Sequence, residues 1–420
     1  MQDLPPEPLR PWQVAVAGMV AMAVAMGIGR FAFTPLLPMM LADGVTNLAS
    51  ASWLASANYL GYLVGALLCT FQPLVWQKVG KLPPVHATAM VRVGLGSTVL
   101  LTLGMTLQVP TVWPLMRFLA GVVSALVFVY TSGWCLGQFA GLKVPAMGAL
   151  IYIGPGSGIV LSGLAVSAMV AQHRSAATGW IAFGLLAAVL TALVWPLFSA
   201  RHGVPTTATQ APSASAATDS PTHGGTEVAL LAVAYGLAGF GYIITATFFP
   251  VIARQTLPGS AWLDLFWPLF GLGVVAGALI ASRVRSAGDF RVRLAFCYAV
   301  QALAITASLV FPNLAGFITG SLLLGLPFTA ITFFAMQEVR RLRPAHVSST
   351  TGLVTAVYGL GQIVGPPLVA LLLAHSASVG AGFNLSLEIA VAALALGVLL
   401  YGVMVRAYPL ARAGHRAWLG

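Results

Sequence analysis

Long apolar segments separated by short polar stretches cover almost the whole chain. A helix needs about 20 mostly apolar residues to cross a bilayer, and twelve segments meet that length. The first six lie at about 13–41, 50–76, 86–108, 112–139, 146–171 and 178–199. The other six lie at about 227–252, 262–282, 293–312, 315–337, 348–375 and 385–406. The pattern therefore predicts an all-α membrane protein with twelve transmembrane helices.

One long polar interruption, residues 201–226, divides the chain into two parts of similar length. It is rich in Ser, Thr, Ala and Pro and has no hydrophobic period, which is typical of a flexible linker. We therefore expect an N-terminal six-helix unit at 1–200, a linker at 201–226 and a C-terminal six-helix unit at 227–420.

The composition agrees with a membrane protein. Hydrophobic residues make up 59% of the chain and charged residues only 7%, whereas soluble domains carry roughly 25% charged residues. A chain this apolar cannot cover itself with polar surface, so much of its exterior must face the lipid bilayer. The 45 Gly and 26 Pro are found largely within apolar segments, where Gly permits close helix packing and Pro permits kinks.

The net charge of +11 comes from 20 Lys and Arg that are scattered through short loops. Nucleic-acid binding would need these residues clustered on one face, so we exclude it. With the N-terminus inside, fifteen of them fall on the inner side and two on the outer side, Arg174 and Arg254. Arg30, Arg92 and Arg117 lie within spans. Because cytoplasmic loops carry the excess of Lys and Arg, both termini are expected in the cytoplasm.

Residues for metal, disulfide or hydrolytic chemistry are not gathered in the sequence. Cys69, Cys135 and Cys297 all lie in apolar segments, with neither metal-ligand spacing nor a disulfide framework. The seven His fall in loops or at predicted helix ends. We therefore expect no cofactor and no enzyme activity. The first apolar run is too long for a cleavable signal, so we expect it to be retained as a span.

An internal repeat relates the two halves. GIGRFAFTPLLP at 27–38 matches GFGYIITATFFP at 239–250, and LGYLVGALL at 60–68 matches LGVVAGALI at 272–280, both 212 residues apart. Gly154-Pro155 matches Gly365-Pro366 at a separation of 211 residues. Three matches in helix order at nearly one separation indicate two pseudo-symmetric six-helix bundles.

Two parallel six-helix repeats with a long central linker resemble the major facilitator superfamily. Arg117-Phe-Leu-Ala-Gly121 is similar to its RxxxG element, and Gly154-Pro155-Gly156-Ser157-Gly158 to its GPxxG element, which is common in antiporters. GIGRFAFTPLLPMM (27–40), SANYLGYLVGALL (56–68) and GFGYIITATFFP (239–250) resemble the YbfB/YjiJ subgroup more narrowly. The loop at 74–84 departs from the superfamily pattern, because it has Lys78 and Lys81 but no acid.

Arg30 is the strongest candidate for substrate contact. An ionised group deep in a bilayer is costly unless it is paired or hydrated, so its presence suggests a function. A guanidinium stays charged and suits a carboxylate or phosphate; the alternative is a structural cation held by backbone carbonyls. Tyr242 occupies the repeat-equivalent position. The resemblance implies that the first and seventh spans face each other across a central cavity, with Arg30 and Tyr242 on opposite sides.

Further polar and aromatic residues could line the same cavity. For each one alone, a hydrogen bond between helices is the simpler reading, but together they suggest an amphipathic site for a small organic molecule. The remaining candidates for substrate binding are Asn58, Tyr59, Tyr62, Tyr152, Trp267, Tyr358 and Gln362.

Coupling is harder to place because acids are scarce, with only 9 Asp and Glu in the chain. Asp264, just inside an apolar stretch, is the most plausible titrating group, although an interfacial carboxylate at a helix end is the simpler reading. Arg117 is either a coupling residue or a structural link between helices. The Gly-Pro pairs, Gly154-Pro155 and Gly365-Pro366, are candidates for gating. Proton coupling itself is implied only by the resemblance.

These features favour a secondary active transporter that moves an anionic or amphipathic small organic solute by alternating access. We expect a monomer in a bacterial inner membrane, with import and export both open. The alternative is a non-transporting receptor or sensor derived from a transporter fold. A membrane-embedded enzyme would need His, Asp or Glu clustered at one depth, which the sequence does not offer.

Overall fold

A computed structural model describes residues 9–79, 85–107, 109–199, 224–260, 262–284, 288–344 and 347–410. The elements in these ranges are helices, and they form twelve segments long and apolar enough to cross a membrane. The prediction of a twelve-helix, all-α membrane protein is therefore confirmed. Residues 201–223 of the predicted linker lie outside the described ranges, as do five of the basic residues, Lys81, Arg201, Arg285, Arg412 and Arg416.

Within its described residues, the first half builds its six spans from ten helical elements. These are α1 (Pro11–Met22), η1 (Ala23–Arg30), α2 (Phe33–Ala42), α3 (Leu48–Val79), α4 (Ala87–Gly104), α5 (Trp113–Gly141), η2 (Pro145–Tyr152), α6 (Ile153–Ala171), α7 (Ala176–Val194) and η3 (Trp195–Phe198). The second half contains α8 (Gly225–Thr256), η5 (Leu263–Leu265), α9 (Phe266–Arg283), α10 (Phe290–Val310), α11 (Leu314–Gly325), α12 (Phe328–Leu342), α13 (Val347–His375) and α14 (Val379–Ala407).

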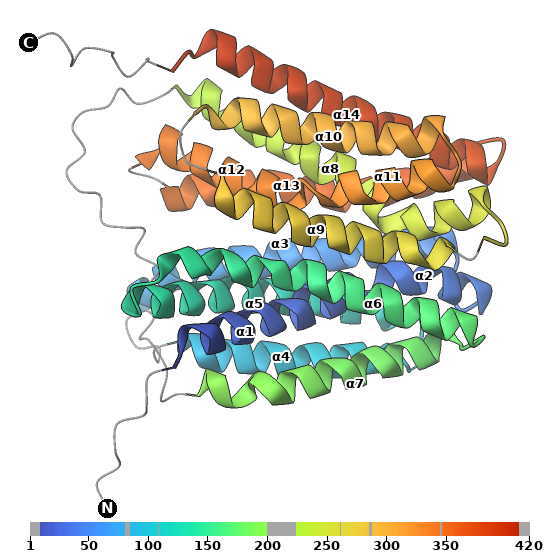
Figure 1. The fold of residues 1–420 in the computed structure, drawn as a ribbon, viewed down its shortest axis with the longest axis horizontal. Coiled ribbons are helices and arrows are strands. Elements are labelled where there is room, and N and C mark those ends of the chain that lie inside the picture. Colours follow the sequence, from blue (N-terminus) through green and yellow to red (C-terminus); the bar gives the residue numbers. More distant parts are fainter. Residues whose placement is uncertain are drawn as a thin grey trace, which may run out of the picture.

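The helices form two bundles that lie against each other (Figure 1). In the N-terminal bundle α5 packs against α3 and α4, and in the C-terminal bundle α8 packs against α13 and α14. The two bundles meet mainly where α3 contacts α13 and where α6 contacts α9. The start of α1 and the end of α14 lie at one end of the molecule, the left end in Figure 1, which we call the terminal end. The opposite end is the far end.

The first span is broken where the sequence predicts one continuous helix. It runs as an α-helix to Met22, as a π-helix from Ala23 to Arg30, and as an α-helix again from Phe33. Pro35 explains part of the break, because its ring clashes with the carbonyl group four residues earlier, that of Phe31. The repeat-equivalent α8 continues unbroken from Gly225 to Thr256. The two halves are therefore not symmetric at the level of Arg30.

Two other spans are also divided. The tenth span, predicted at about 315–337, stops at Gly325 and restarts at Phe328. The intervening Pro327 lacks a backbone N–H, which explains the interruption. The fifth span begins with a 3₁₀-helix that ends at Tyr152, and α6 follows directly. Pro155 therefore stands in the first turn of α6, where proline is tolerated, and not at a kink within the helix.

Glycines set the position of the first span against the fifth. A Cβ atom built on Gly27 would lie only 2.4 Å from the Cα atom of Gly158. The backbones of η1 and α6 therefore approach so closely that a side chain cannot fit between them. On the outside of the bundles, large apolar side chains such as Leu100, Leu193 and Phe296 are mostly exposed, as expected for surfaces that face lipid acyl chains.

Candidate functional site

Arg30 is joined to the C-terminal bundle by a chain of hydrogen bonds. It is the last residue of the π-helix, and its side chain is buried, with an exposed fraction of 5%. Its Nη2 donates to Oε1 of Gln362 in α13 at 2.9 Å. Nε2 of Gln362 in turn donates to the hydroxyl group of Tyr242 in α8. The structure thus brings together three residues that the sequence predicts for one site.

Aromatic faces surround the Arg30 guanidinium on its own side of the site. Its Cζ lies 4.0 Å from the ring centre of Tyr62, 5.2 Å from that of Phe31 and 5.5 Å from that of Tyr59. These faces attract a cation through their quadrupoles, but they do not neutralise its charge. Among the described residues Arg30 forms no ion pair with an acid, and its Nε is buried without a hydrogen-bond partner.

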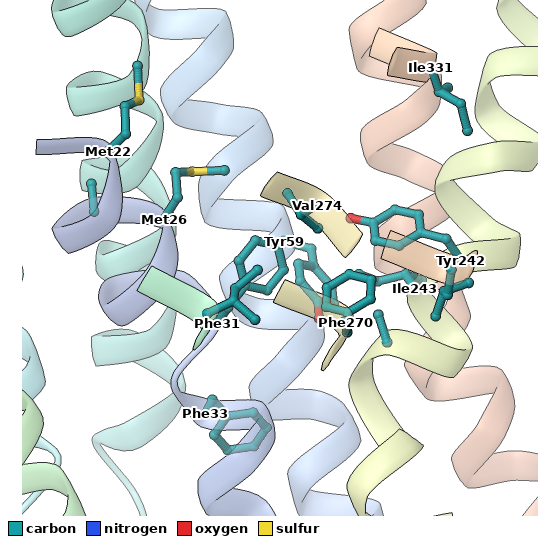
Figure 2. Packing of buried hydrophobic residues seen from close by; sticks show 14 of the residues in the cluster. Met22, Met26, Phe31, Phe33, Tyr59, Tyr242, Ile243, Phe270, Val274 and Ile331 are labelled. Carbon is teal, nitrogen blue, oxygen red and sulfur yellow. The ribbon is translucent and has the colours of Figure 1, made fainter. Parts of the chain in front are cut away.

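Further aromatic rings extend the site into the C-terminal bundle. Figure 2 draws Phe31 and Tyr242 on facing helices of the two bundles. The rings of Phe31 and Phe328 are 6.2 Å apart, and those of Phe328 and Tyr242 are 5.2 Å apart. The Trp267 ring is 6.3 Å from Phe31, and its Nε1 is buried without a hydrogen-bond partner among the described residues. The site therefore combines aromatic walls with unused hydrogen-bond donors.

Tyr358 continues these walls toward the terminal end. Its ring lies nearly parallel to that of Tyr242, at 6.1 Å and 18°. On its other side it stacks on Tyr235 at 4.4 Å and 25°. Tyr358 is partly exposed, whereas Tyr235 and Tyr242 are buried. The three rings form a stack along α8 and α13.

Two further hydrogen bonds connect the bundles near Arg30. The hydroxyl groups of Tyr59 in α3 and Thr247 in α8 lie 2.9 Å apart. The Ser56 hydroxyl, also in α3, donates to the backbone carbonyl of Ile363 in α13 at 2.9 Å. Together with the bond between Arg30 and Gln362, these contacts join the first and second spans to the seventh and eleventh. They hold the two halves together in the described state.

Comparison with known proteins identifies the family of this chain. A family model described as "Uncharacterised MFS-type transporter YbfB" matches residues 22–401. The chain belongs to this major facilitator family. No curated protein matches the chain by sequence. The resemblance read from the sequence motifs is therefore confirmed, and the protein is a membrane transporter of the major facilitator superfamily.

Two crystal structures of the nucleoside transporter NupG have a similar fold. One is of a mutant and superimposes with a TM-score of 0.72 at 14% sequence identity, covering 94% of this chain and 99% of that one. The other has a TM-score of 0.65 at 12% identity, with the same coverage. At these identities the likeness shows the fold alone.

Arg117 and Asn58 of this major facilitator transporter lie behind the site. The Arg117 guanidinium donates to the backbone carbonyls of Gly29 and Arg30 at 3.3 and 3.0 Å, and it lies over the Phe33 ring. It thus satisfies carbonyl groups at the point where the first span breaks. Asn58, predicted to bind substrate, donates to the Arg117 carbonyl at 2.9 Å. Its amide therefore faces α5 and links two helices of one bundle.

Tyr152, Gly154 and Asp264, also predicted, have partners other than Arg30. Tyr152 packs its ring 6.1 Å from Phe128 within the N-terminal bundle. A Cβ atom on Gly154 would meet the Met19 carbonyl at 2.3 Å, so this glycine permits close packing of α1 and α6. Asp264 forms an ion pair with Arg254 at the far end. This pairing matches the reading of Asp264 as a carboxylate at a helix end.

In the other Gly-Pro pair, Gly365 likewise permits close packing of two helices. A Cβ atom there would lie 2.7 Å from the Ile243 side chain of α8. Pro366 and Pro367 stand inside α13, which continues past them to His375. Both Gly-Pro pairs thus lie where helices pack closely, and their proposed part in gating stays a prediction.

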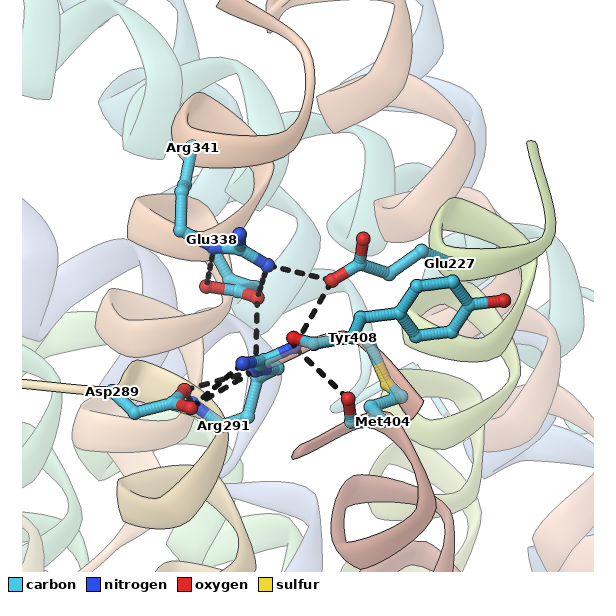
Figure 3. A network of polar contacts seen from close by, with 7 residues as sticks. All are labelled: Glu227, Asp289, Arg291, Glu338, Arg341, Met404 and Tyr408. Carbon is cyan, nitrogen blue, oxygen red and sulfur yellow. Dashed lines mark hydrogen bonds and ion pairs between the residues drawn. The ribbon is translucent and has the colours of Figure 1, made fainter. Parts of the chain in front are cut away.

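Sequence reasoning missed a buried cluster of charges at the terminal end of the C-terminal bundle (Figure 3). At its centre, Arg291 has no exposed side-chain surface and pairs with Glu227 at 3.1 Å and with Asp289 at 2.8 Å. Arg341 pairs with Glu227 and Glu338, both at 2.6 Å. Arg291 also donates to two carbonyl groups at the end of α14, those of Met404 and Tyr408.

The cluster ties together the ends of four helices, α8, α10, α12 and α14. Burial alone would raise the pKa of the Asp289 carboxyl. Hydrogen bonds from the Arg291 side chain and backbone, together with the charge of Arg291, hold that pKa below its usual range. The available sequence signal was an acid near each of three helix ends, with arginines at two of them. Only the tertiary fold shows that they meet.

Proposed function

We propose that this protein is a secondary active transporter that carries a small organic anion between the two bundles by alternating access, with Arg30 as the residue that binds the anionic group. The observation that carries the proposal is the buried Arg30 guanidinium, which has no acidic partner among the described residues. A buried charge without a counter-charge is costly. A bound anion would supply that charge each time the carrier is loaded.

The nature of the site supports an organic anion over a neutral solute. NupG is a nucleoside transporter, and a nucleoside has a flat base but no charge. The aromatic walls formed by Phe31, Tyr242 and Phe328 would suit such a flat body equally well. A neutral solute would leave Arg30 without a charge partner, so we favour a flat molecule that carries a carboxylate.

The contacts between the bundles suggest how access could alternate. The bonds from Arg30, Ser56 and Tyr59 to the C-terminal bundle would have to break when the two halves rock apart. The distribution of Lys and Arg supports a cytoplasmic location for the terminal end, in a bacterial inner membrane. We include proton coupling in the proposal because membership of the superfamily implies it. The site itself adds no support, since the only acid predicted for that role, Asp264, is paired with Arg254.

Flux across a membrane tests the proposal and separates it from a receptor without transport. The purified protein is reconstituted in liposomes, and uptake of a mixture of labelled aromatic and aliphatic carboxylates is measured with and without an imposed pH gradient. We expect uptake of at least one carboxylate by the wild type and its loss in Arg30→Ala. Arg92→Ala is the matched control, because Arg92 donates to the Trp195 carbonyl at the edge of the bundle. Binding without flux would contradict transport.

A further inference from the structure

Gln362 uses both ends of its amide inside the site. Its side chain is buried, with an exposed fraction of 2%. Oε1 accepts the hydrogen bond from Arg30 Nη2, and Nε2 donates to the Tyr242 hydroxyl. An amide oxygen has nearly the same shape as one oxygen of a carboxylate, but it is neutral. Gln362 therefore fills the position beside the guanidinium that an anionic group would take.

We propose that Gln362 is a displaceable stand-in for the substrate's anionic group, and that the substrate is a carboxylate attached to a flat aromatic body. This inference rests on the function proposed above, which already favours a flat carboxylate, and adds to it the residue that the substrate must displace. A carboxylate adds the attraction of a full opposite charge, and it can accept two parallel N–H bonds from the guanidinium, whereas Gln362 accepts one. A carboxylate can therefore replace the Gln362 oxygen on Arg30, whereas a neutral amide gains nothing by doing so.

Unused donors on Arg30 and on Trp267, whose ring packs against that of Phe31, support a carboxylate. Arg30 Nε and Trp267 Nε1 are both buried, and neither has a hydrogen-bond partner among the described residues. A carboxylate has two oxygens and about four acceptor sites, so it can take the position of the Gln362 oxygen and still accept from a second donor. The rings of Phe31, Phe328 and Tyr242 supply the aromatic contacts for the flat body.

Displacement of Gln362 would also loosen the contact between the bundles. Gln362 and the next residue, Ile363, both accept hydrogen bonds from the N-terminal bundle, from Arg30 and from Ser56. When the substrate binds Arg30 in place of Gln362, the first of these two adjacent contacts on α13 is lost. The Tyr242 hydroxyl is released at the same time and can bind the substrate. Occupation of the site is thereby linked to the freedom of the bundles to move apart.

Substitutions at position 362 test the stand-in role through the direction of their effects. Binding is measured in detergent with benzoate as the probe and benzamide as its neutral counterpart. Gln362→Leu removes the competing oxygen, so it should bind benzoate about tenfold more tightly than the wild type. Gln362→Glu places a carboxylate on Arg30, so it should lose the benzoate response. If Gln362 simply contacted the substrate, Gln362→Leu would bind more weakly, which would overturn the proposal.

A measurement without ligand tests the same contact independently. Gln362→Glu should melt several degrees above the wild type, because it creates an ion pair with Arg30, and the added Arg30→Met substitution should abolish this gain. Gln301→Glu is the matched control: Gln301 is also a buried glutamine within a span, bonded to the Leu324 carbonyl, and its substitution should lower the melting temperature. A Gln362→Glu variant that melts at or below the wild type would refute the stand-in role.

The outcomes also separate this inference from the proposed function. A wild type that benzoate does not stabilise would refute the aromatic class of substrate, while flux of another anion would leave the transport proposal standing. Transport that depends on Arg30, together with weaker binding in Gln362→Leu, would refute only the stand-in role. Failure of every carboxylate to bind or cross would remove both.

Discussion

The Arg117 guanidinium donates a hydrogen bond to the backbone carbonyl of Arg30, so one buried arginine holds the helix end that carries the other. The first span changes from a π-helix to an α-helix at this point, and carbonyl groups near the break need donors from outside the helix. π-Helical turns often occur at functional sites. Here the turn directs Arg30 toward Gln362 and the facing bundle.

Loss of the Arg117 side chain should therefore displace Arg30, although Arg117 itself does not bind the substrate. We expect Arg117→Met to leave the carbonyls of Gly29 and Arg30 unsatisfied, at a cost of about 1–3 kcal/mol for each buried group. Flux should fall at least about tenfold, as expected when a binding group is misplaced. Melting curves and uptake in liposomes measure both effects. Arg117→Lys should restore part of the activity; an Arg117→Met variant with full flux would show that Arg30 needs no such support.

Close backbone packing at Gly27 gives a second prediction. Gly27→Val would force side-chain atoms into Gly158, because even a Cβ atom would lie 2.4 Å from its Cα. Overpacking of this kind typically costs about 1–3 kcal/mol. We expect a lower melting temperature and reduced flux. Gly96→Ala is the control, since nothing lies within 4 Å of a Cβ there, and it should be neutral or slightly stabilising. Equal behaviour of the two variants would contradict the close approach of η1 and α6.

The charge cluster predicts a large effect at a position far from Arg30. Arg291 has no exposed side-chain surface and pairs with Glu227, Asp289 and Glu338. Removal of one partner from a buried ion pair typically costs about 3–5 kcal/mol, so Arg291→Met should be strongly destabilising. Arg341→Met should cost less, because its side chain is 21% exposed. The melting temperatures of the two variants show which substitution costs more. A lower melting temperature for Arg341→Met than for Arg291→Met would contradict the placement of Arg291 at the centre of the cluster.

Acid should weaken the same cluster through Asp289. Its pKa is held below the usual value of about 3.9 in the folded protein. A carboxyl group with a lowered pKa stabilises the fold fully above its unfolded pKa, and this contribution is lost as the pH falls through the folded pKa. The difference in melting temperature between wild type and Asp289→Asn should therefore be present at neutral pH and shrink below about pH 4. A difference that is constant with pH would show that the charge of Asp289 is not involved.

Much of the fold follows from local patterns in the sequence. Twelve apolar segments gave the twelve spans, the repeat made Arg30 and Tyr242 equivalent positions, and the resemblance to the superfamily implied that their helices face each other. Their contact through Gln362 could not be derived, because it depends on where α13 lies between the two bundles. The π-helix at Ala23–Arg30 was also missed, since the carbonyls of Gly29 and Arg30 at its end are satisfied by Arg117 from another helix.

Side-chain direction shows a further limit of sequence patterns. Asn58, Tyr59 and Tyr62 form one polar stripe on α3, yet the stripe is wide enough to meet different neighbours. Asn58 faces α5 and bonds to Arg117, whereas Tyr59 and Tyr62 lie against Arg30. Helical periodicity predicts that these residues share a side of the helix. Only the positions of the neighbouring helices decide which of them reaches the site.

The most direct test of the account is whether the ligand supplies the negative charge that Arg30 lacks. Thermal stabilisation is measured for matched pairs of carboxylates and their neutral amides, with wild type, Arg30→Gln and the control Arg92→Gln. We predict that the carboxylates stabilise the wild type and Arg92→Gln, that their amides do not, and that Arg30→Gln loses the response. Equal stabilisation by carboxylates and amides, or an unchanged carboxylate response in Arg30→Gln, would contradict the account.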